Sequence, residues 1–157
     1  MDSEALKIPK KLKQVKIWVH PEGPVAGAIF LHCQSDRHDG AEQPVEAMNG
    51  PEPFFVLRGL GDDDIRFYNK NAVVRLEYTA EPDESPPSGC VALGSRLHLM
   101  DGSNLEGVIR ELLVPEHARL FDYVNIFEDR FVRLFMDDNL VALVNKAYIV
   151  RVTPLDH

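Results

Sequence analysis

Two copies of an Asn-Lys dipeptide, each followed by an arginine, carry the side chains best suited to bind a ligand. Amide, ammonium and guanidinium groups all donate hydrogen bonds, as recognition of a phosphate or a base edge requires. The candidate binding residues are Asn69, Lys70, Arg75, Asn145, Lys146 and Arg151. In a competing interpretation, each asparagine shapes a tight turn, because asparagine tolerates a positive φ angle and bonds its own backbone. We favour the turn-forming role and keep these residues as candidates.

Catalytic and metal-binding patterns are not found in the sequence. His32, Cys33 and His38, together with Cys90, could supply soft metal ligands, but their spacing matches no zinc signature. The sequence contains no Gly-x-Ser-x-Gly, no phosphate-binding loop and no His-Glu-x-x-His. We therefore expect no enzymatic activity, no metal site and no cofactor.

The composition is that of an acidic globular chain. Of the 157 residues, 45% are hydrophobic and 27% are charged, which is enough to build a core. The formal net charge of −8 disfavours a general basic surface for nucleic acid. No apolar run approaches the roughly 20 residues that cross a bilayer, so no membrane partner is expected. The charged N-terminus does not resemble a signal peptide, and two cysteines are too few for a disulfide framework, which predicts a reducing cytoplasm.

Charge and proline mark the predicted domain boundaries. The first 16 residues contain five lysines against Asp2 and Glu4, and we expect a basic N-terminal arm over residues 1–14. This arm is either solvated or in contact with an acidic partner or with the protein's own acidic body. Residues 79–89 hold three prolines and no large apolar side chain, so residues 79–94 are predicted to form a linker.

The segments on either side of this linker are similar to each other. Residues 15–29 match residues 95–109 at an offset of 80, and residues 49–76 match the chain again at an offset of 76. The second match contains nine identities in 28 positions, against about two expected by chance. The identical residues are Asn49, Glu52, Phe55, Val56, Asp62, Asn69, Lys70, Val74 and Arg75. We infer a tandem of two units, residues 15–78 and 95–154.

Each unit is predicted to consist of short strands and one helix. Apolar residues alternate along the opening strands, as with Ile17 and Val19, and Gly27 and Gly107 would let the second strands bend sharply. Short helices are expected near residues 42–48 and 115–125, each ending at an asparagine that can take the left-handed conformation. The closing strands are expected at 54–58, 65–68 and 72–78, and at 130–136, 140–144 and 148–153. We therefore predict a mainly β fold of two tandem five-stranded barrels, each with one short helix.

The order of these elements resembles the Sm-like and SH3-like small barrels. The resemblance is carried by residues 97–109, with an Asp-Gly turn before the glycine-containing strand, and by residues 143–152, in which a polar turn joins two strands. It implies that the Asn-Lys turns lie where Sm proteins form part of an RNA-base pocket. The chain departs from the Sm pattern after the bent strand, where variable segments and a helix replace the family's loop. The chain is also similar to a bacterial domain family of uncharacterised function, which implies a fold and no activity.

A protein-interaction module is the function that these observations favour. Small barrels bind partners along exposed strand edges and on aromatic surfaces. Trp18, the single tryptophan, is a candidate interface anchor, and its alternative role is to pack the two barrels against each other or against the lysine-rich arm. We predict a non-enzymatic adaptor or scaffold of a bacterial cytoplasm, with an unidentified protein partner and with homo-oligomers as an option. The alternative is a divergent Sm-like RNA-binding protein, which the acidic charge disfavours.

Overall fold

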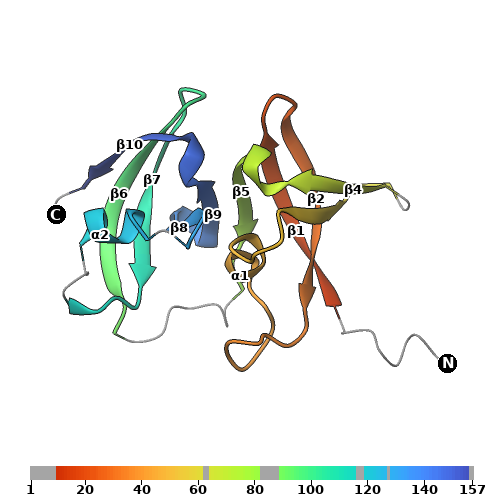
Figure 1. Ribbon diagram of the computed structural model, residues 1–157, viewed down its shortest axis with the longest axis horizontal. Coiled ribbons are helices and arrows are strands. Elements are labelled where there is room, and N and C mark those ends of the chain that lie inside the picture. Colours follow the sequence, from red (N-terminus) through yellow and green to blue (C-terminus); the bar gives the residue numbers. More distant parts are fainter. Residues whose placement is uncertain (1–9, 62–63, 82–88, 116–118, 127, 156–157) are drawn as a thin grey trace.

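The described residues fold into a ten-stranded antiparallel sheet with two short helices (Figure 1), which confirms the mainly β prediction. The structure, a computed structural model, describes residues 10–61, 64–81, 89–115, 119–126 and 128–155. The first half contains β1 (Lys10–Val19), β2 (Gly23–His32), α1 (Pro44–Met48), β3 (Phe54–Arg58), β4 (Ile65–Asn69) and β5 (Val73–Thr79). The second half contains β6 (Val91–Leu99), β7 (Asn104–Glu111), α2 (Leu120–Val124), β8 (Phe131–Phe135), β9 (Leu140–Asn145) and β10 (Ile149–Pro154). Within the described ranges, no helix has the length and apolar character needed to cross a membrane.

The predicted arm and linker fall partly outside the described residues. β1 begins at Lys10, so residues 10–14 of the predicted arm belong to a strand. β6 begins at Val91, inside the predicted linker. Residues 1–9 of the arm and residues 82–88 of the linker lie outside the described ranges. Both opening strands are therefore longer than the alternation of apolar residues indicated.

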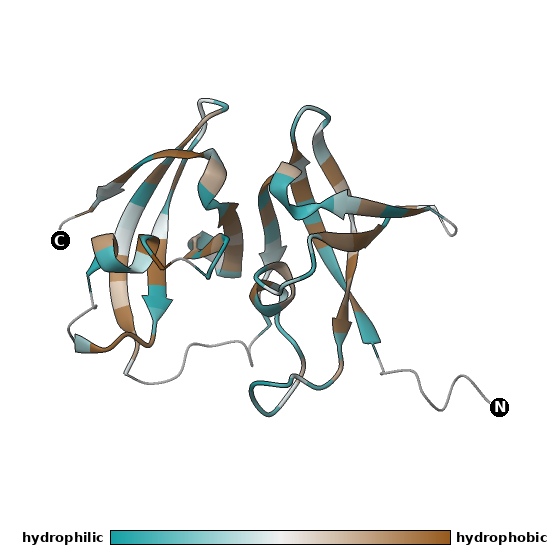
Figure 2. Cartoon of the chain, viewed as in Figure 1, coloured by the Kyte–Doolittle hydropathy of each residue, from teal (hydrophilic) through white to brown (hydrophobic). Residues whose placement is uncertain are grey.

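Alternating burial explains why these segments are strands. Along β1, Val15, Ile17 and Val19 are buried, whereas the residues between them are more exposed. Apolar stretches accordingly lie on the strands, and the loop between β2 and α1 is mostly hydrophilic (Figure 2). The sheet thus presents apolar faces that must be covered by other parts of the chain.

A glycine within β2 and within β7 lets the neighbouring strand approach closely. A Cβ atom on Gly27 would lie 2.6 Å from the Arg58 carbonyl oxygen, and a Cβ atom on Gly107 would lie 2.5 Å from the Phe135 carbonyl oxygen. A side chain cannot be accommodated at such distances without moving the backbone. Lack of space therefore requires glycine at both positions.

The two halves have the same strand order, but they do not form the two separate barrels that we predicted. The order across the sheet is β10-β6-β7-β8-β9-β5-β1-β2-β3-β4. The halves are continuous because β5 pairs with β9, with residues 75–79 opposite residues 140–144. We call this contact the joint. Each half thus pairs one strand edge with the other half instead of closing on itself, and β4 and β10 become the end strands of the sheet, at opposite sides of the molecule in Figure 1.

The strand registers of the two halves correspond, with one exception in β3. β1 and β2 pair at the same positions as β6 and β7 once 80 is added to the residue number. In the next hairpin, Phe54 faces Asn69, whereas Phe131 faces Asn145. We call residues at the same pairing position of the two halves counterparts. The gapless alignment is therefore wrong in β3: the counterpart of Phe131 is Phe54 and not Phe55, because the loop after β3 is one residue longer in the first half.

Two apolar cores form among the described residues, and each contains residues from both halves. The first core consists of Val15, Ile17, Val19, Ile29, Leu31, Met48, Leu57, Tyr68, Val73, Leu76, Tyr78, Phe131, Val141 and Leu143. The second core consists of Val74, Leu97, Leu99, Leu105, Ile109, Tyr123, Val132, Leu134, Ala142 and Val144. The hairpin of β8 and β9 presents side chains to both cores. Each half therefore helps to complete the core of the other.

A pair of hydrogen bonds also fixes α1 to β8. Asn49, which follows α1, donates from Nδ2 to the Phe131 carbonyl oxygen (3.2 Å) and accepts at Oδ1 from the Phe131 N–H (2.7 Å). The φ angles are −91° at Asn49 and −96° at Asn125, which follows α2, so neither takes the left-handed conformation that we predicted. The asparagine after α1 serves the contact between the halves rather than the end of the helix.

Candidate interaction surface

The Asn-Lys dipeptides lie in 3-10 turns that join β4 to β5 and β9 to β10. Asn69 Oδ1 accepts a hydrogen bond from the Asn71 N–H (2.8 Å), and Asn145 Oδ1 accepts one from the Ala147 N–H (2.9 Å). The φ angles of the two asparagines are −72° and −69°, so the local bond holds each turn without a positive φ. The Asn145 amide nitrogen also donates to two carbonyl oxygens of the first half, and Asn145 is buried.

Both lysines of these turns donate hydrogen bonds to backbone carbonyls. Lys70 is 1% exposed, and its Nζ donates to the carbonyl oxygens of Ala47 (2.9 Å) and Gly50 (3.3 Å). Lys146 Nζ donates to the Ile126 carbonyl oxygen (2.6 Å). Burial lowers the pKa of both ammonium groups below the ordinary value for lysine. Each lysine ties its turn to the end of the short helix, so both ammonium groups are engaged within the protein.

Trp18 and Arg75 lie where the two halves meet. The Arg75 guanidinium carbon is 3.8 Å from the centre of the Trp18 ring, a cation–π contact, and Arg75 also pairs with Glu77 (3.0 Å). Trp18 belongs to β1 but packs against the second core, and Arg75 donates to Ser103 Oγ of the second half (3.2 Å). Trp18 and Arg75 thus connect the first half to the second, and whether Trp18 also contacts a partner stays a prediction. Arg151, at the other end of the sheet, is exposed.

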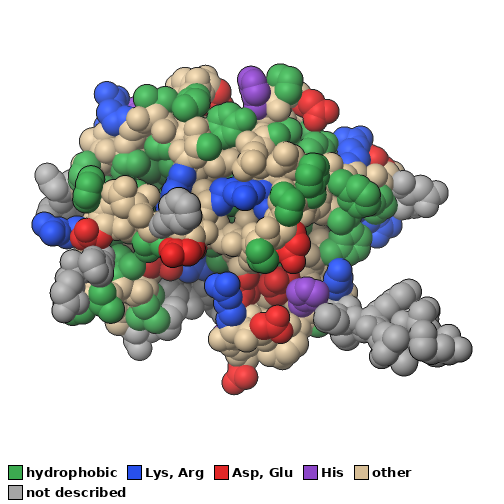
Figure 3. All heavy atoms as spheres, in the orientation of Figure 1, with side chains coloured by type: hydrophobic (Ala, Val, Ile, Leu, Met, Phe, Trp, Pro, Cys, Tyr) green, Lys and Arg blue, Asp and Glu red, His purple; other side chains and the backbone are tan. Residues whose placement is uncertain are grey.

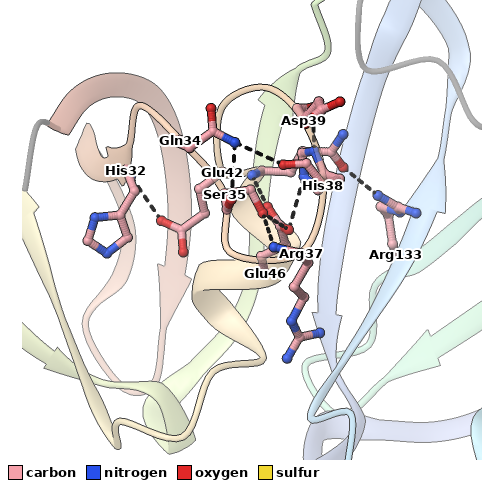
Figure 4. A network of polar contacts seen from close by, with 10 residues as sticks. His32, Gln34, Ser35, Arg37, His38, Asp39, Glu42, Glu46 and Arg133 are labelled. Atoms are coloured by element: carbon pink, nitrogen blue, oxygen red, sulfur yellow. Dashed lines mark hydrogen bonds and ion pairs between the residues drawn. The ribbon is translucent and has the colours of Figure 1, made fainter.

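A polar network organises the loop between β2 and α1 (Figure 4). Glu46 accepts a hydrogen bond from Ser35 Oγ (2.7 Å) and pairs with His38 Nε2 (3.0 Å). The pKa of His38 is raised, first by a hydrogen bond to the backbone of the next residue and then by Glu46. Arg133 of β8 donates to Gln43 Oε1 (2.9 Å) and so connects this loop to the second half. Ser35 and His38 both bond to the carboxylate and not to each other, which is not the arrangement of a nucleophile activated by a base.

The candidate metal ligands do not converge on one site. Among the residues that the structure describes, no three His, Cys, Asp or Glu side chains are grouped so that they could hold a metal ion. Cys33 is exposed, Cys90 is half-buried, and both thiols are free. A hollow of about 260 Å³ beside α1 and β3 is lined by apolar side chains together with Lys10, His32, Glu42, Glu52 and Lys70. The Lys70 ammonium in this hollow already bonds to the backbone.

The feature that these contacts leave unused is an apolar surface on β3 and β4. Phe54 is 52% exposed, Ile65 is 47% exposed and Phe67 is 72% exposed. Their pairing positions place all three on one face of the hairpin, and we call them the β3–β4 apolar surface. Figure 3 shows hydrophobic side chains gathered at the end of the molecule where β4 lies. Among the described strands, β4 pairs with β3 alone, so its other edge presents free N–H and C=O groups beside this surface.

The sequence contained a signal for this surface that the strand patterns did not use. Phe67 and Tyr68 are adjacent in β4, so both faces of the strand carry an aromatic side chain. Such a pattern is typical of a strand that is covered on both faces. Tyr68 is buried in the first core, whereas Phe67 is exposed. An apolar outer face on an end strand indicates that a partner covers it.

Comparisons with known proteins assign no family to this chain. Family models, curated proteins and solved structures yielded no match. The resemblance to Sm-like and SH3-like barrels therefore stays a prediction. Function has to be inferred from the surface itself.

Proposed function

We propose that this protein is a non-enzymatic protein–protein interaction module, an adaptor or scaffold of a bacterial cytoplasm, and that it binds its partner through the β3–β4 apolar surface. The observation that carries this proposal is the joint exposure of Phe54, Ile65 and Phe67 on one face of an end hairpin. Single exposed apolar side chains are common, but a contiguous group favours an interface. Fully burying each one contributes about 1.5–3 kcal/mol. The free thiols of Cys33 and Cys90 fit a reducing compartment.

The unpaired edge of β4 would also specify how a partner is oriented on this apolar surface. A partner strand alongside β4 would satisfy its outward N–H and C=O groups while side chains of the partner cover Phe67. End strands whose outer edge stays unpaired in the native protein usually carry lysine or proline. Residues 65–69, Ile-Arg-Phe-Tyr-Asn, contain neither. Arg66 pairs with Asp64 (2.9 Å), so this part of the edge has little net charge to repel a partner.

The alternative, a divergent Sm-like RNA-binding protein, depends on the Asn-Lys turns. Support for the resemblance itself comes from the strand order that both halves share. However, the lysines of both turns bond to the protein's own backbone. The net charge of −8 also opposes the approach of a phosphate backbone. We therefore rank protein binding above RNA binding.

A photoreactive amino acid in place of Phe67 tests this proposal in the full chain. The purified protein is illuminated in a bacterial cell extract, and its adducts are identified by mass spectrometry. The matched control carries the same group at Leu112, which is 63% exposed in the second half. We expect protein adducts at position 67 to be several-fold more abundant than at position 112.

Other outcomes of this experiment distinguish the alternatives. Adducts with RNA, or purified protein whose ultraviolet spectrum shows bound nucleic acid, would favour the RNA-binding alternative. Equal yields of protein adducts at positions 67 and 112 would overturn the β3–β4 apolar surface as the binding site.

A further inference from the structure

We propose that the partner of the β3–β4 apolar surface is a second copy of this chain, bound head to tail. β4 of one copy would pair with β10 of the next and so repeat, between molecules, the joint that β9 and β5 form within the chain. This inference rests on the proposed function, since it names the occupant of the same surface. Its basis is that groups exposed at the two ends of the sheet have counterparts that are paired or buried at the joint.

The two end strands are counterparts of the two strands that form the joint. In the strand order of each half, β4 corresponds to β9 and β10 corresponds to β5. Because β9 pairs with β5 at the centre of the sheet, the two end strands are counterparts of the two strands that pair there. A second copy therefore offers β4 the kind of strand with which its counterpart already pairs.

The exposed side chains of the β3–β4 apolar surface are counterparts of buried side chains at the joint. Three residues of the second half enter the first core and are fully buried there: Phe131, Val141 and Leu143. The strand registers make these residues the counterparts of the three in the β3–β4 apolar surface, which are 47–72% exposed. The chain thus contains the same apolar hairpin face twice, and only one of the two is covered.

The opposite end of the sheet presents the counterpart of the receiving strand. Val150 on β10 is 65% exposed, whereas its counterpart Val74 on β5 is 7% exposed within the second core. The difference arises because β9 lies beside β5, while β10 is an end strand of the described sheet. In a head-to-tail pair, β4 of the neighbouring copy would lie beside β10 and cover Val150.

Two asparagines at the ends of the sheet correspond to asparagines that bond across the joint. Asn49 bonds to both backbone groups of Phe131, and Asn145 donates to two carbonyl oxygens of the first half. In the described part of the chain, Asn69 is the counterpart of Asn145, and Asn125 follows α2 as Asn49 follows α1. Among the described residues, Asn69 and Asn125 bond only to backbone groups two and four residues away. A neighbouring copy would supply the missing acceptors and donors at both positions.

The register of the joint predicts the register between copies. Leu76 faces Leu143 at the joint, so Val152 of one copy would face Phe67 of the next. Pro154 has no N–H, so the new ladder would have one donor fewer than the joint. In addition, β4 and β10 of different copies are not connected by the chain, as β5 and β9 are. The pairing between copies should therefore be weaker than the joint and should depend on protein concentration. Because the two surfaces differ, the copies would close into a ring or continue as a filament, depending on the rotation between them.

Two blocked variants test this pairing in the full chain. Phe67→Glu places a carboxylate on the β4 end, and Val150→Glu places one on the β10 end. Both positions are exposed in a single copy, so folding should be retained, which circular dichroism checks. Sedimentation velocity from about 1 to 100 µM should show oligomers of the wild type and association weakened by about tenfold or more in each variant. Leu112→Glu, the control at another exposed position, should behave as the wild type.

Mixing the two blocked variants is the decisive measurement. Each variant keeps one intact surface, so the equimolar mixture should form a dimer and stop there, while each variant alone stays monomeric. In a dimer that pairs β4 of one copy with β4 of the other, the Phe67→Glu variant would lack the surface that pairs, so mixing would not restore its association. A wild type that stays monomeric at the highest concentration, or a mixture that does not dimerise, would overturn the head-to-tail pairing. A different protein cross-linked at position 67 would then leave the proposed function standing, whereas the absence of any protein adduct there would remove both.

Discussion

Truncation of Leu143 should destabilise the entire chain, because this residue connects the two halves. Leu143 belongs to β9, faces Leu76 of β5 and is fully buried in the first core. A leucine-to-alanine change at such a site removes transfer free energy and leaves a cavity, which together cost about 2–5 kcal/mol. We expect Leu143→Ala to lower the free energy of unfolding by at least about 2 kcal/mol.

The matched control is Phe67→Ala, since Phe67 on β4 is the counterpart of Leu143. Phe67 is mostly exposed, so its truncation removes little buried surface from a single copy. In protein dilute enough to prevent association, we expect the free energy of unfolding to change by less than about 1 kcal/mol. Substitution by alanine at these two counterpart positions separates the stability contributed by the joint from the stability contributed by the strand itself.

Urea unfolding measures both effects with two probes. Trp18 of β1 packs against the second core, so its fluorescence reports on the contact between the halves, while far-ultraviolet circular dichroism reports on the sheet. We expect one transition with the same midpoint for both probes, and a shift of the midpoint by about 1–2 M in Leu143→Ala at unchanged slope. The shared core would be refuted if Leu143→Ala cost no more than Phe67→Ala, or if the Trp18 transition separated from that of the sheet.

Three further changes test other contacts. Asn49→Ala removes both bonds to the Phe131 backbone and should cost about 1–3 kcal/mol in the same urea assay; a cost near zero would argue against this bond pair. Gly107→Ala would place a Cβ atom 2.5 Å from the Phe135 carbonyl oxygen and should lower the melting temperature by about 5 °C or more; an unchanged melting temperature would contradict the close approach. Burial raises the pKa of Glu111 above its ordinary value, so the folded chain holds this proton more tightly than the unfolded chain does. The resulting stability is fully present at pH values below the pKa of Glu111 in the unfolded chain, and it is lost as the pH rises through the pKa of Glu111 in the folded chain. Glu111→Gln should remove this decline from urea-unfolding free energies measured across the carboxylate range, and an identical decline in the variant would show that another group causes it.

The strands were predictable because alternation in sequence reflects alternation in burial. The segments expected at 54–58 and 65–68 match β3 and lie within β4, respectively. The pairing of β5 with β9 was not predictable in this way. A strand edge has the same side-chain pattern whether it closes its own barrel or pairs with the other half, because edge pairing uses backbone groups. Separate barrels and a continuous sheet therefore look alike in the sequence.

The candidate residues were visible in the sequence, but their contacts were not. Lys70 and Lys146 recur because both turns need a donor for carbonyls after a short helix, so a repeated polar residue reflects a repeated structural need. The gapless alignment paired Phe55 with Phe131 through a chance identity. A shift of one residue moves a side chain to the other face of a strand, so this error hid the counterpart role of Phe54.

The small size of each half explains why a shared sheet is favoured over separate barrels. A unit of about 60 residues buries only about 60% of its surface when it folds alone, and inserting the hairpin of β8 and β9 into the first core adds buried apolar area that an isolated unit lacks. The same construction leaves the equivalent hairpin of β3 and β4 uncovered. A monomeric chain would be expected to protect this edge with charge or proline. Residues 65–69 carry isoleucine, phenylalanine and tyrosine, and their one charged residue, Arg66, is paired with Asp64. The uncovered hairpin is therefore best explained as one side of a contact whose other side belongs to another molecule.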